Sequence, residues 1–245
     1  MAARAKTKSK KKPTKGKRPA RRSFKRWLSL WLLRAVAVVF LIAALGTVIF
    51  AVFNPPTNFY MRSEASRLGG VKQDWVALEN IAPVMARSAV AAEDANFCQH
   101  WGFDMQAIRA ALAEGSARGA STISQQTVKN VYLWQGRSWV RKALEALMTP
   151  LVEAVWSKRR IIEVYLNIAE FDEGVFGVGA ASRHYFGVSA RDLSPTQAAR
   201  LAAILPSPKR RSASNPSSFT RKRTRQIRDG AATIRADGRS DCFES

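Results

Sequence analysis

Two acidic side chains close an Ala-rich apolar stretch and could carry acid–base chemistry. Glu93 and Asp94 follow the apolar run 89–92, and His100 and Asp104 come shortly after them. A carboxylate at the end of an apolar helix can act as a general base where it faces a cleft. The same residues also fit an exposed helix end with a hydrogen-bonded histidine. The local pattern leaves both interpretations open.

A second polar block, residues 119–130, reads GASTISQQTVKN. Thr122 and Gln125 have the spacing of a helix capping box, and Thr122, Gln126 and Lys129 then share one face of the predicted helix. Free N–H groups at the start of such a helix can bind an anion. The pattern G-x-x-x-x-G-K-[ST] is absent, so a nucleotide P-loop is excluded. An ordinary capped helix with a solvated face is the competing interpretation.

Charged residues gather in two further segments. The third cluster consists of Arg137, Arg141, Lys142 and Glu145, and the fourth spans residues 158–167. Arg141 and Glu145 lie four residues apart, which on a helix also fits a surface ion pair worth about 0.3–0.5 kcal/mol. The fourth cluster likewise fits the solvated face of an amphipathic helix.

The elements that must position these groups are helices. Alternating strand patterns are scarce and no internal repeat is visible, so the predicted fold class is mainly α. Pro150 is expected to bend or end the helix that contains it. Past Ser212 the composition turns to Ser, Pro and Arg, and we expect residues 206–245 to form a loosely attached basic helix or tail. Helical periodicity predicts helices over 81–92, 104–112, 122–130, 139–156, 158–167, 180–185 and 195–205.

An uncharged apolar run covers residues 35–53. As a helix it is about 28 Å long, close to the thickness of the hydrocarbon core of a bilayer. Trp27 and Trp31 suit the interface, and Arg34 can snorkel from the helix end. A buried soluble helix would have a polar face, and a cleaved signal peptide has a shorter apolar core. An uncleaved membrane anchor is therefore the favoured interpretation.

The positive charge of the chain is concentrated at its two ends. Of the 40 Lys and Arg residues, 13 lie in residues 1–26, which contain no acidic residue. The positive-inside bias then keeps the N-terminus in the cytoplasm and places the chain beyond the anchor outside it. No nucleic-acid-binding signature accompanies the basic tail, so a nucleic-acid partner is not expected.

Composition excludes two other classes of protein. The hydrophobic fraction of 47% rules out a wholly disordered chain. Cys98 and Cys242 are the only cysteines, too few for a disulfide scaffold, and no Cys/His spacing suggests zinc. Whether these two cysteines pair is left open.

Taken together, the four clusters form an ordered series of motifs. They read E-D-x-x-F-x-x-H-x-G from Glu93, G-x-S-T-I-S-Q-Q-x-x-K-N from Gly119, R-K-x-x-E from Arg141 and K-x-x-I-x-E-x-Y-L-N from Lys158. This series resembles the signature blocks of the peptidoglycan glycosyltransferases, the family that includes the glycosyltransferase modules of class A penicillin-binding proteins. The resemblance spans about residues 57–215. The basic, single-anchor architecture is similar to the stand-alone, monofunctional members.

The resemblance implies a lysozyme-like, mainly α glycosyltransferase domain with a membrane-facing jaw, preceded by one transmembrane helix. Residues 131–134 and Trp139 are the apolar stretch assigned to the jaw, and burial in the core is the competing interpretation. About 30 residues remain beyond Ser214, so no transpeptidase domain is expected. The implied organisation is a basic cytoplasmic tail (1–26), a transmembrane anchor (27–53), the glycosyltransferase domain (57–215) and a basic C-terminal tail (216–245).

The implied activity is the polymerisation of lipid II into linear β-1,4-linked glycan strands, with inversion and release of undecaprenyl pyrophosphate. Glu93 would be the general base, and Glu145 would orient the cations or stabilise the oxocarbenium-like centre. Lys129, Arg137 and Arg141 would stabilise the departing pyrophosphate. The remaining residues implied to bind or position substrate are Asp94, Thr122, Gln126 and Asn130.

The implied surroundings follow from this substrate. The partners are lipid II, undecaprenyl-pyrophosphate-linked glycan and membrane lipid, with other cell-wall synthesis and division proteins as further candidates. The location is the bacterial inner membrane, with a cytoplasmic N-terminus and a periplasmic catalytic domain. No cofactor is required, although a divalent cation at the pyrophosphate is left open, and no metal ligands are predicted.

Two other functions compete with this one. A lysozyme-like lytic enzyme also needs a glutamate, but it cleaves a neutral glycoside and has no use for Lys129, Arg137 and Arg141 around its cleft. A cell-wall scaffold that has lost catalysis would be favoured by an altered glutamate, whereas Glu93 and Glu145 are both present.

Overall fold

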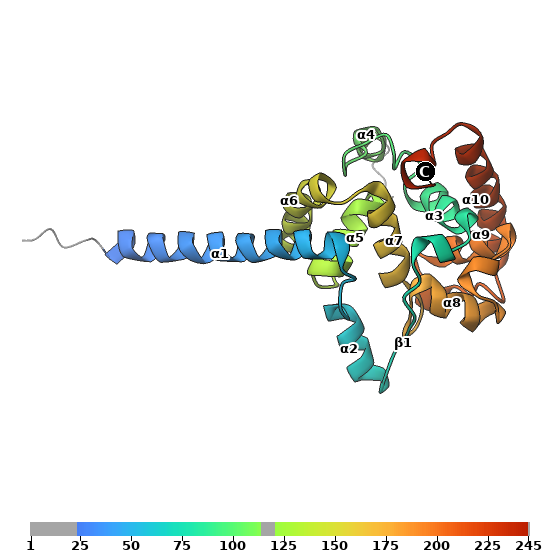
Figure 1. The fold of residues 1–245 in the computed structure, drawn as a ribbon, viewed down its shortest axis with the longest axis horizontal. Coiled ribbons are helices and arrows are strands. Elements are labelled where there is room, and N and C mark those ends of the chain that lie inside the picture. The colour runs from blue at the N-terminus through green and yellow to red at the C-terminus, as the bar shows by residue number, and fades with distance from the viewer. Residues whose placement is uncertain (1–23, 114–120, 245) are drawn as a thin grey trace, which may run out of the picture. The chain divides into compact units, whose positions relative to one another are not determined.

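The computed structural model describes residues 24–113 and 121–244 and confirms a mainly α fold (Figure 1). Residues 1–23 of the predicted tail and Gly119 lie outside the described residues. The helices are α1 (Phe24–Val52), α2 (Phe59–Leu68), α3 (Pro83–Glu93), α4 (Met105–Ala113), α5 (Ile123–Tyr132), α6 (Trp139–Val155), α7 (Lys158–Ile168), α8 (Gly177–Phe186), α9 (Pro195–Ile204), α10 (Ser218–Ala236) and α11 (Asp241–Glu244). Short 3-10 turns are η1 (Leu78–Asn80), η2 (Ala190–Asp192) and η3 (Pro208–Arg210), and the strands are β1 (Lys72–Gln73), β2 (Glu170–Asp172) and β3 (Val175–Phe176).

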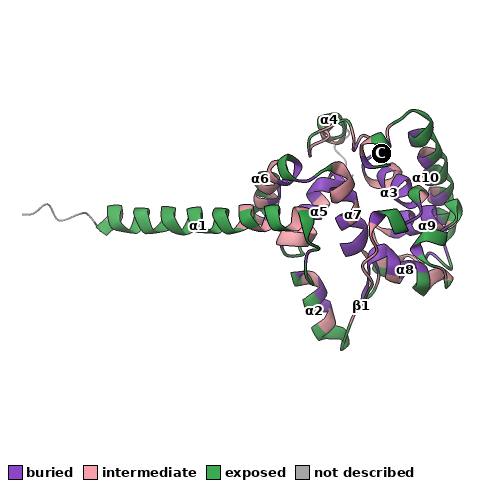
Figure 2. Cartoon of the chain, in the orientation of Figure 1, coloured by how far each residue is buried: buried purple, intermediate pink, exposed green. Residues whose placement is uncertain are grey.

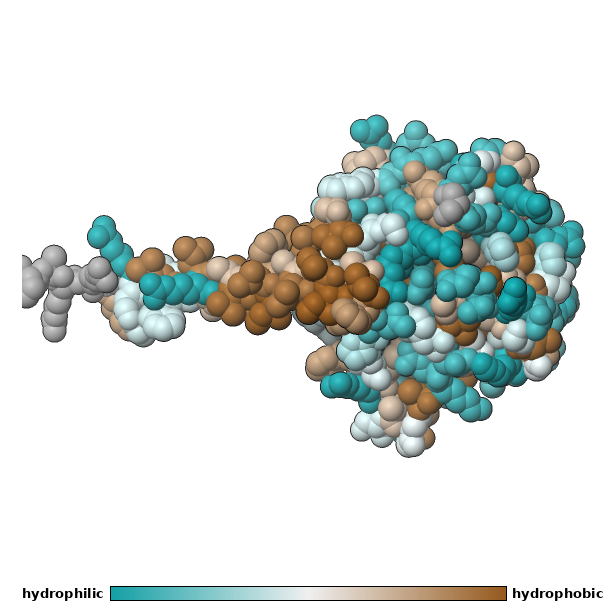
Figure 3. All heavy atoms as spheres, viewed as in Figure 1, coloured by the Kyte–Doolittle hydropathy of each residue, from teal (hydrophilic) through white to brown (hydrophobic). Residues whose placement is uncertain are grey.

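Helix α1 turns its apolar side chains outward. Leu32, Val39 and Leu41 are each about two-thirds exposed, and Figures 2 and 3 show an exposed, hydrophobic surface along the helix. The stretch 26–52 is long and apolar enough to cross a membrane. A soluble core helix would bury these side chains, so that interpretation is wrong. The helix is compatible with a single-pass membrane anchor.

The chain divides into two compact units, Met1–Ile42 and Ala43–Ser245. The last turns of α1 therefore belong to the second unit. Thr47 is buried, and its carbonyl oxygen accepts a hydrogen bond from Trp156 Nε1 at 2.7 Å. The guanidinium of Arg160 donates to the carbonyl oxygens of Phe50 at 3.1 Å and Phe53 at 2.8 Å. Arg160 thus satisfies carbonyl groups that a helix leaves unpaired at its C-terminus.

Two groups of helices build the second unit. Helix α5 packs against α6 and α7, and α3 packs against α9 and α10 (Figure 1). Helix α7 also contacts α8, which lies against a small sheet of strand order β1-β3-β2. In this sheet β1 is parallel to β3, with Lys72 opposite Val175, and β2 is antiparallel to β3, with Glu170 opposite Phe176. The core between these elements contains Phe97, Tyr165, Phe171, Phe176 and Met85.

The expected helices are present, and Pro150 does not end the one that contains it. Helix α6 continues past Pro150 to Val155. Val152 and Trp156 are buried beyond the proline. Burial of the apolar face of this last turn outweighs the one backbone hydrogen bond that the proline removes.

The expected basic helix is present as α10, but it is packed against the domain, so the expectation of loose attachment is wrong. In α10, Thr220, Thr224, Ile227, Ala231 and Ile234 are buried. This helical spacing aligns them on one face, against α3 and α9. The many arginines of the segment concealed this apolar stripe, because they occupy the remaining faces of the same helix.

A disulfide also fixes the C-terminus. Cys98, after α3, is bonded to Cys242 in α11, which settles the pairing that the sequence left open. The bond closes a sequence separation of 144 residues. Phe243 is buried next to it and lies 6.2 Å from Phe97 between ring centroids.

Candidate active site

Glu93 is the last residue of α3, which begins with Pro83 in the first turn and buries Met85, Ala89 and Val90. This burial fixes the direction in which the helix ends. The Glu93 carboxylate accepts a hydrogen bond from Gln126 Nε2 at 2.9 Å. Burial raises the pKa of Glu93 above its ordinary value, and the Gln126 hydrogen bond opposes that shift. A carboxylate with a raised pKa is a stronger base than one in water.

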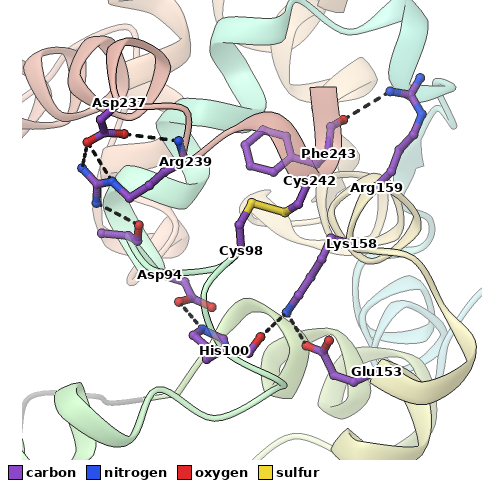
Figure 4. Close-up of a disulfide and its surroundings, with 11 residues drawn as sticks. Asp94, Cys98, His100, Glu153, Lys158, Arg159, Asp237, Arg239, Cys242 and Phe243 are labelled. Carbon is purple, nitrogen blue, oxygen red and sulfur yellow. Dashed lines mark hydrogen bonds and ion pairs between the residues drawn. A yellow bond between two sulfur atoms is a disulfide. The ribbon is translucent and has the colours of Figure 1, made fainter. Parts of the chain in front are cut away.

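Asp94 connects the end of α3 to the start of α5. Its carboxylate is buried, with Oδ1 2.8 Å from His100 Nε2 and Oδ2 accepting the N–H of Ile123 at 3.0 Å. Figure 4 shows Asp94 pointing toward His100. Both carboxylate oxygens are therefore engaged inside the protein, and their contacts fix where the neighbouring Glu93 lies relative to α5.

Thr122 is the N-cap of α5, as its spacing predicts. Its side chain and that of Gln125 form the reciprocal capping box. The Thr122 hydroxyl also donates to the carbonyl oxygen of Gly102 at 2.7 Å. Gly102 has φ +84°, and a Cβ there would lie 2.5 Å from Thr149 Cγ2, so a larger residue would displace this loop. Thr122 is 2% exposed and acts within the protein.

A cavity of about 390 Å³ runs along one face of α5. Gln126, Lys129 and Asn130 contribute to its wall, together with Tyr165 of α7. Burial lowers the pKa of Lys129, whereas the charge of Glu145 raises it. Asn130 accepts a hydrogen bond from Gln135 at 3.1 Å. Gln126 and Lys129 of the predicted polar face therefore border this cavity, whereas Thr122 lines a second cavity together with Glu93 and Asp94.

The start of α6 holds an ion-paired carboxylate. Glu145 is 2% exposed, and its Oε2 lies 3.0 Å from Arg141 Nη1. Its Oε1 pairs with Lys142, which also donates to Ser121 Oγ at 3.0 Å. Arg141 and Lys142 share Glu145 as partner, and the charges of all three residues act on the pKa of Lys129. We therefore call Lys129, Arg141 and Lys142 the cation cluster. The surface-pair interpretation of Arg141 and Glu145 is wrong, since Glu145 is buried.

Arg137 forms no hydrogen bond or ion pair with Glu145, the carboxylate that holds Arg141 and Lys142. It is exposed in the turn before α6, and no hydrogen bond or ion pair joins it to the residues that the structure describes. Within the described part of the chain no residue holds the Arg137 side chain in place, so it would contact substrate only by extending from the surface toward it. In contrast, Lys142 is in the cluster although sequence reasoning did not select it. Its position three residues before Glu145 was the available signal.

A buried ion pair between Lys158 and Glu153 lies beside His100 (Figure 4). Lys158, the first residue of α7, donates to Glu153 Oε1 and to the carbonyl oxygen of His100, both at 2.8 Å. Ser124 in α5 donates to the same Glu153 oxygen. Sequence reasoning gave Glu153 no role and noted His100 only as part of the Glu93 motif. The contacts that tie them to other helices, Lys158 with the His100 carbonyl oxygen and Ser124 with Glu153, join residues distant along the chain.

The stretch assigned to the jaw is divided between surface and core. Trp139 is 90% exposed and Trp134 42% exposed. Leu133 is buried, and Tyr132 lies 6.1 Å from Phe50 between ring centroids. Two tryptophans of this stretch thus present apolar surface, while Leu133 and Tyr132 pack inward. Within the described ranges, no group of three or more His, Cys, Asp or Glu side chains could hold a metal ion.

Comparison with known proteins assigns this arrangement to a family. Residues 62–231 match the family model described as Transglycosylase. A protein of Jannaschia sp. (strain CCS1) called "Biosynthetic peptidoglycan transglycosylase" is 61% identical over 213 residues, which cover 87% of this chain and 89% of that protein. A protein of Caulobacter vibrioides with the same name is 42% identical, over 89% of this chain and 98% of that protein. One of Pectobacterium atrosepticum is 49% identical, over 82% of this chain and 87% of that protein.

Proposed function

The chain belongs to the peptidoglycan transglycosylase family, and from that premise we propose that its substrate is lipid II. Members of this family are glycosyltransferases that polymerise glycan for peptidoglycan synthesis, and their domain is lysozyme-like. The proposed donor is the growing strand on undecaprenyl pyrophosphate, and the proposed acceptor is the sugar of the next lipid II. The observation that carries the proposal is the Glu93 carboxylate, held by Gln126 on the helix that also carries Lys129.

Glu93 is the proposed general base. The 4-hydroxyl of lipid II attacks C1 of the donor sugar, and a new C–O bond forms on the face opposite the leaving group. The proton of the hydroxyl passes to the Glu93 carboxylate. The bond between C1 and the pyrophosphate oxygen breaks, and its electron pair leaves with the pyrophosphate. The α-linked donor thereby becomes a β-1,4 linkage.

The cation cluster is proposed to receive the departing pyrophosphate. Lys129 and Arg141 supply fixed positive charge where negative charge develops, and Lys142 joins them through Glu145. Glu145 holds Arg141 and Lys142 in place. Arg137 is proposed to reach the pyrophosphate from its exposed position. These cations argue against the lytic alternative, because a hydrolase of neutral glycosides has no developing pyrophosphate to stabilise.

The other predicted site residues are proposed to position Glu93 and the sugars. Asp94 and Thr122 do so through contacts inside the protein. Gln126 orients the Glu93 carboxylate directly. Asn130 lies on the cavity wall, where it can hydrogen-bond a sugar or a phosphate oxygen.

The proposed location is the periplasmic side of the inner membrane, with residues 1–26 in the cytoplasm. The 13 basic residues before the anchor support this orientation. The Cys98–Cys242 disulfide supports an oxidising compartment. The C55 lipid tail of the proposed substrate holds it in the bilayer, with a binding free energy of about 0.8 kcal/mol per buried CH₂. A site on a membrane anchor can meet that substrate without extracting it.

The test is polymerisation of lipid II by the purified full-length chain in detergent. The wild type is expected to produce glycan polymer. Glu93→Gln keeps the size of the side chain and its contact with Gln126 but removes the base, so it is expected to lose about 10²- to 10⁴-fold in rate. Glu79→Gln is the matched control, because Glu79 is 65% exposed and lies on η1. Near-normal polymer from folded Glu93→Gln would overturn the role of Glu93.

A further inference from the structure

The C-terminal segment contacts the loop that follows Glu93 at several points. We call residues 218–244 the C-terminal brace and residues 94–104 the Glu93 loop. Arg239 in the brace donates to the carbonyl oxygen of Ala95 at 3.1 Å, and Cys242 is bonded to Cys98 (Figure 4). Glu244 forms an ion pair at 2.6 Å with Arg87 of α3. Arg239, Cys242 and Glu244 lie outside the motif series and beyond the family-model match, which ends at residue 231.

Arg223 makes the contact nearest to the proposed base. Its Nη2 donates to the carbonyl oxygen of Ala92 at 2.8 Å, and Ala92 immediately precedes Glu93. The last carbonyls of a helix have no partner within it, and a cation at a helix C-terminus is favoured by the helix dipole. Arg223 is only partly exposed, and the packed face of α10 fixes its backbone. The guanidinium is therefore held at the end of α3.

We propose that Arg223 is a positioning residue for Glu93, and that the C-terminal brace holds the Glu93 loop in the geometry that the reaction needs. This inference rests on the proposed role of Glu93 as the base. Arg223 acts in two ways. Its hydrogen bond to Ala92 fixes the end of α3, and its charge favours the ionised carboxylate beside it.

The electrostatic part has a definite sign. Arg223 lowers the pKa of Glu93, and does so more strongly than Lys129 or Arg211. Removing the Arg223 charge therefore raises the pKa of Glu93, so the base is protonated at a higher pH than in the wild type. The charged and titratable groups that face Glu93 are Lys129 of α5, Tyr165 of α7, Arg211 before α10, Arg223 of α10 and the adjacent Asp94.

The experiment compares three variants of the full-length chain by lipid II polymerisation across pH. Arg223→Gln is expected to lower kcat by about ten- to a hundredfold, the effect of one lost charge-assisted hydrogen bond. Its KM should stay within about twofold, since Arg223 lines neither the cavity along α5 nor the cavity at Glu93. The acid limb of its pH–rate profile should move to higher pH. Arg225→Gln is the control, because Arg225 is exposed on the same helix.

Arg223→Lys separates charge from geometry. It should keep the acid limb at the wild-type pH while kcat remains several-fold low, because an ammonium cannot reproduce the guanidinium contact. A merely structural role for Arg223 would lower the amount of active enzyme without moving the acid limb. If Arg223→Gln does not fold, wild-type kcat in Arg223→Lys overturns the proposal.

The outcomes distinguish this inference from the proposed function. Suppose that Glu93→Gln is inactive, and that Arg223→Gln and the control Arg225→Gln have the same acid limb and the same kcat. Only the proposed role of Arg223 then fails. If the wild type forms no polymer, or Glu93→Gln is active, the proposed function itself fails.

Discussion

Glu145 is the buried carboxylate that pairs with two members of the cation cluster, and its replacement by glutamine tests how that cluster is held. The side chain of Glu145 is 3% exposed and pairs with both Arg141 and Lys142. Glu145→Gln keeps the shape of the side chain and removes its charge. Arg141 and Lys142 then lose the negative charge that separates them from each other and from Lys129.

The expected cost follows from burial. Breaking a buried ion pair by removing one partner costs about 3–5 kcal/mol. The Lys142 side chain is 40% exposed, so solvent screens its part of the interaction. The Arg141 side chain is 13% exposed and retains most of its part. We expect Glu145→Gln to lower the free energy of unfolding by about 2–4 kcal/mol, below the full buried-pair cost.

The same substitution should alter the pH dependence of activity. Burial lowers the pKa of Lys129, and the positive charges of Arg141 and Lys142 lower it further. The charge of Glu145 is the strongest influence that raises it. Without Glu145 the pKa of Lys129 falls further, so Lys129 loses its proton at a lower pH. If protonated Lys129 stabilises the pyrophosphate, the alkaline limb of the polymerisation profile moves to lower pH.

Two measurements check this prediction. Urea denaturation should show a lower midpoint with an unchanged m value, the signature of a stability change alone. The pH–rate profile of lipid II polymerisation should show the displaced alkaline limb. Glu79→Gln, at an exposed site, is the control. A stability loss below about 1 kcal/mol, the range of surface pairs, with an unmoved alkaline limb would refute the reasoning.

Three further predictions concern the base, one cation and the disulfide. Glu93→Gln should melt at a higher temperature than wild type at pH 7. The wild-type Glu93 carboxyl has a raised pKa in the folded state, so its ionisation destabilises the fold as pH rises. The difference in melting temperature should vanish at a pH below the pKa of the unfolded state. Arg141→Lys should lose about tenfold in affinity for a phosphoglycolipid that mimics the donor, since an ammonium lacks the two-donor grip on phosphate, as titration calorimetry would measure. Joint Cys98→Ser and Cys242→Ser changes should lower the free energy of unfolding by about 2–4 kcal/mol in urea denaturation, because the bond closes a long loop.

Each of these has a contradicting result. A Glu93→Gln melting temperature equal to wild type at every pH would mean that the carboxylate is well solvated. Equal ligand affinity in Arg141→Lys and wild type would place the phosphate away from Arg141. Wild-type stability in the serine variant under oxidising conditions would show that the brace is held by its other contacts.

Local patterns predicted most of the helices, because their causes are local. Pro83 in the first turn of α3 and the Thr122–Gln125 capping box act within a few residues of chain. The apolar run of α1 is a property of composition alone. By contrast, α10 was missed as a packed element, since its buried stripe, which includes Ile227 and Ile234, is spread among arginines.

The ordered motifs by themselves determined the family and the chemistry expected of Glu93 and the cations, and the uncharged apolar run 35–53 predicted the apolar helix α1. Only the tertiary structure decided which of these groups meet. It brought Lys142 into the cation cluster, left Arg137 exposed and placed Arg223 against Ala92, 131 residues away along the chain. The reason is physical. A side chain's type follows from its codon, but its burial, partners and pKa depend on elements that pack together only when the whole domain has folded.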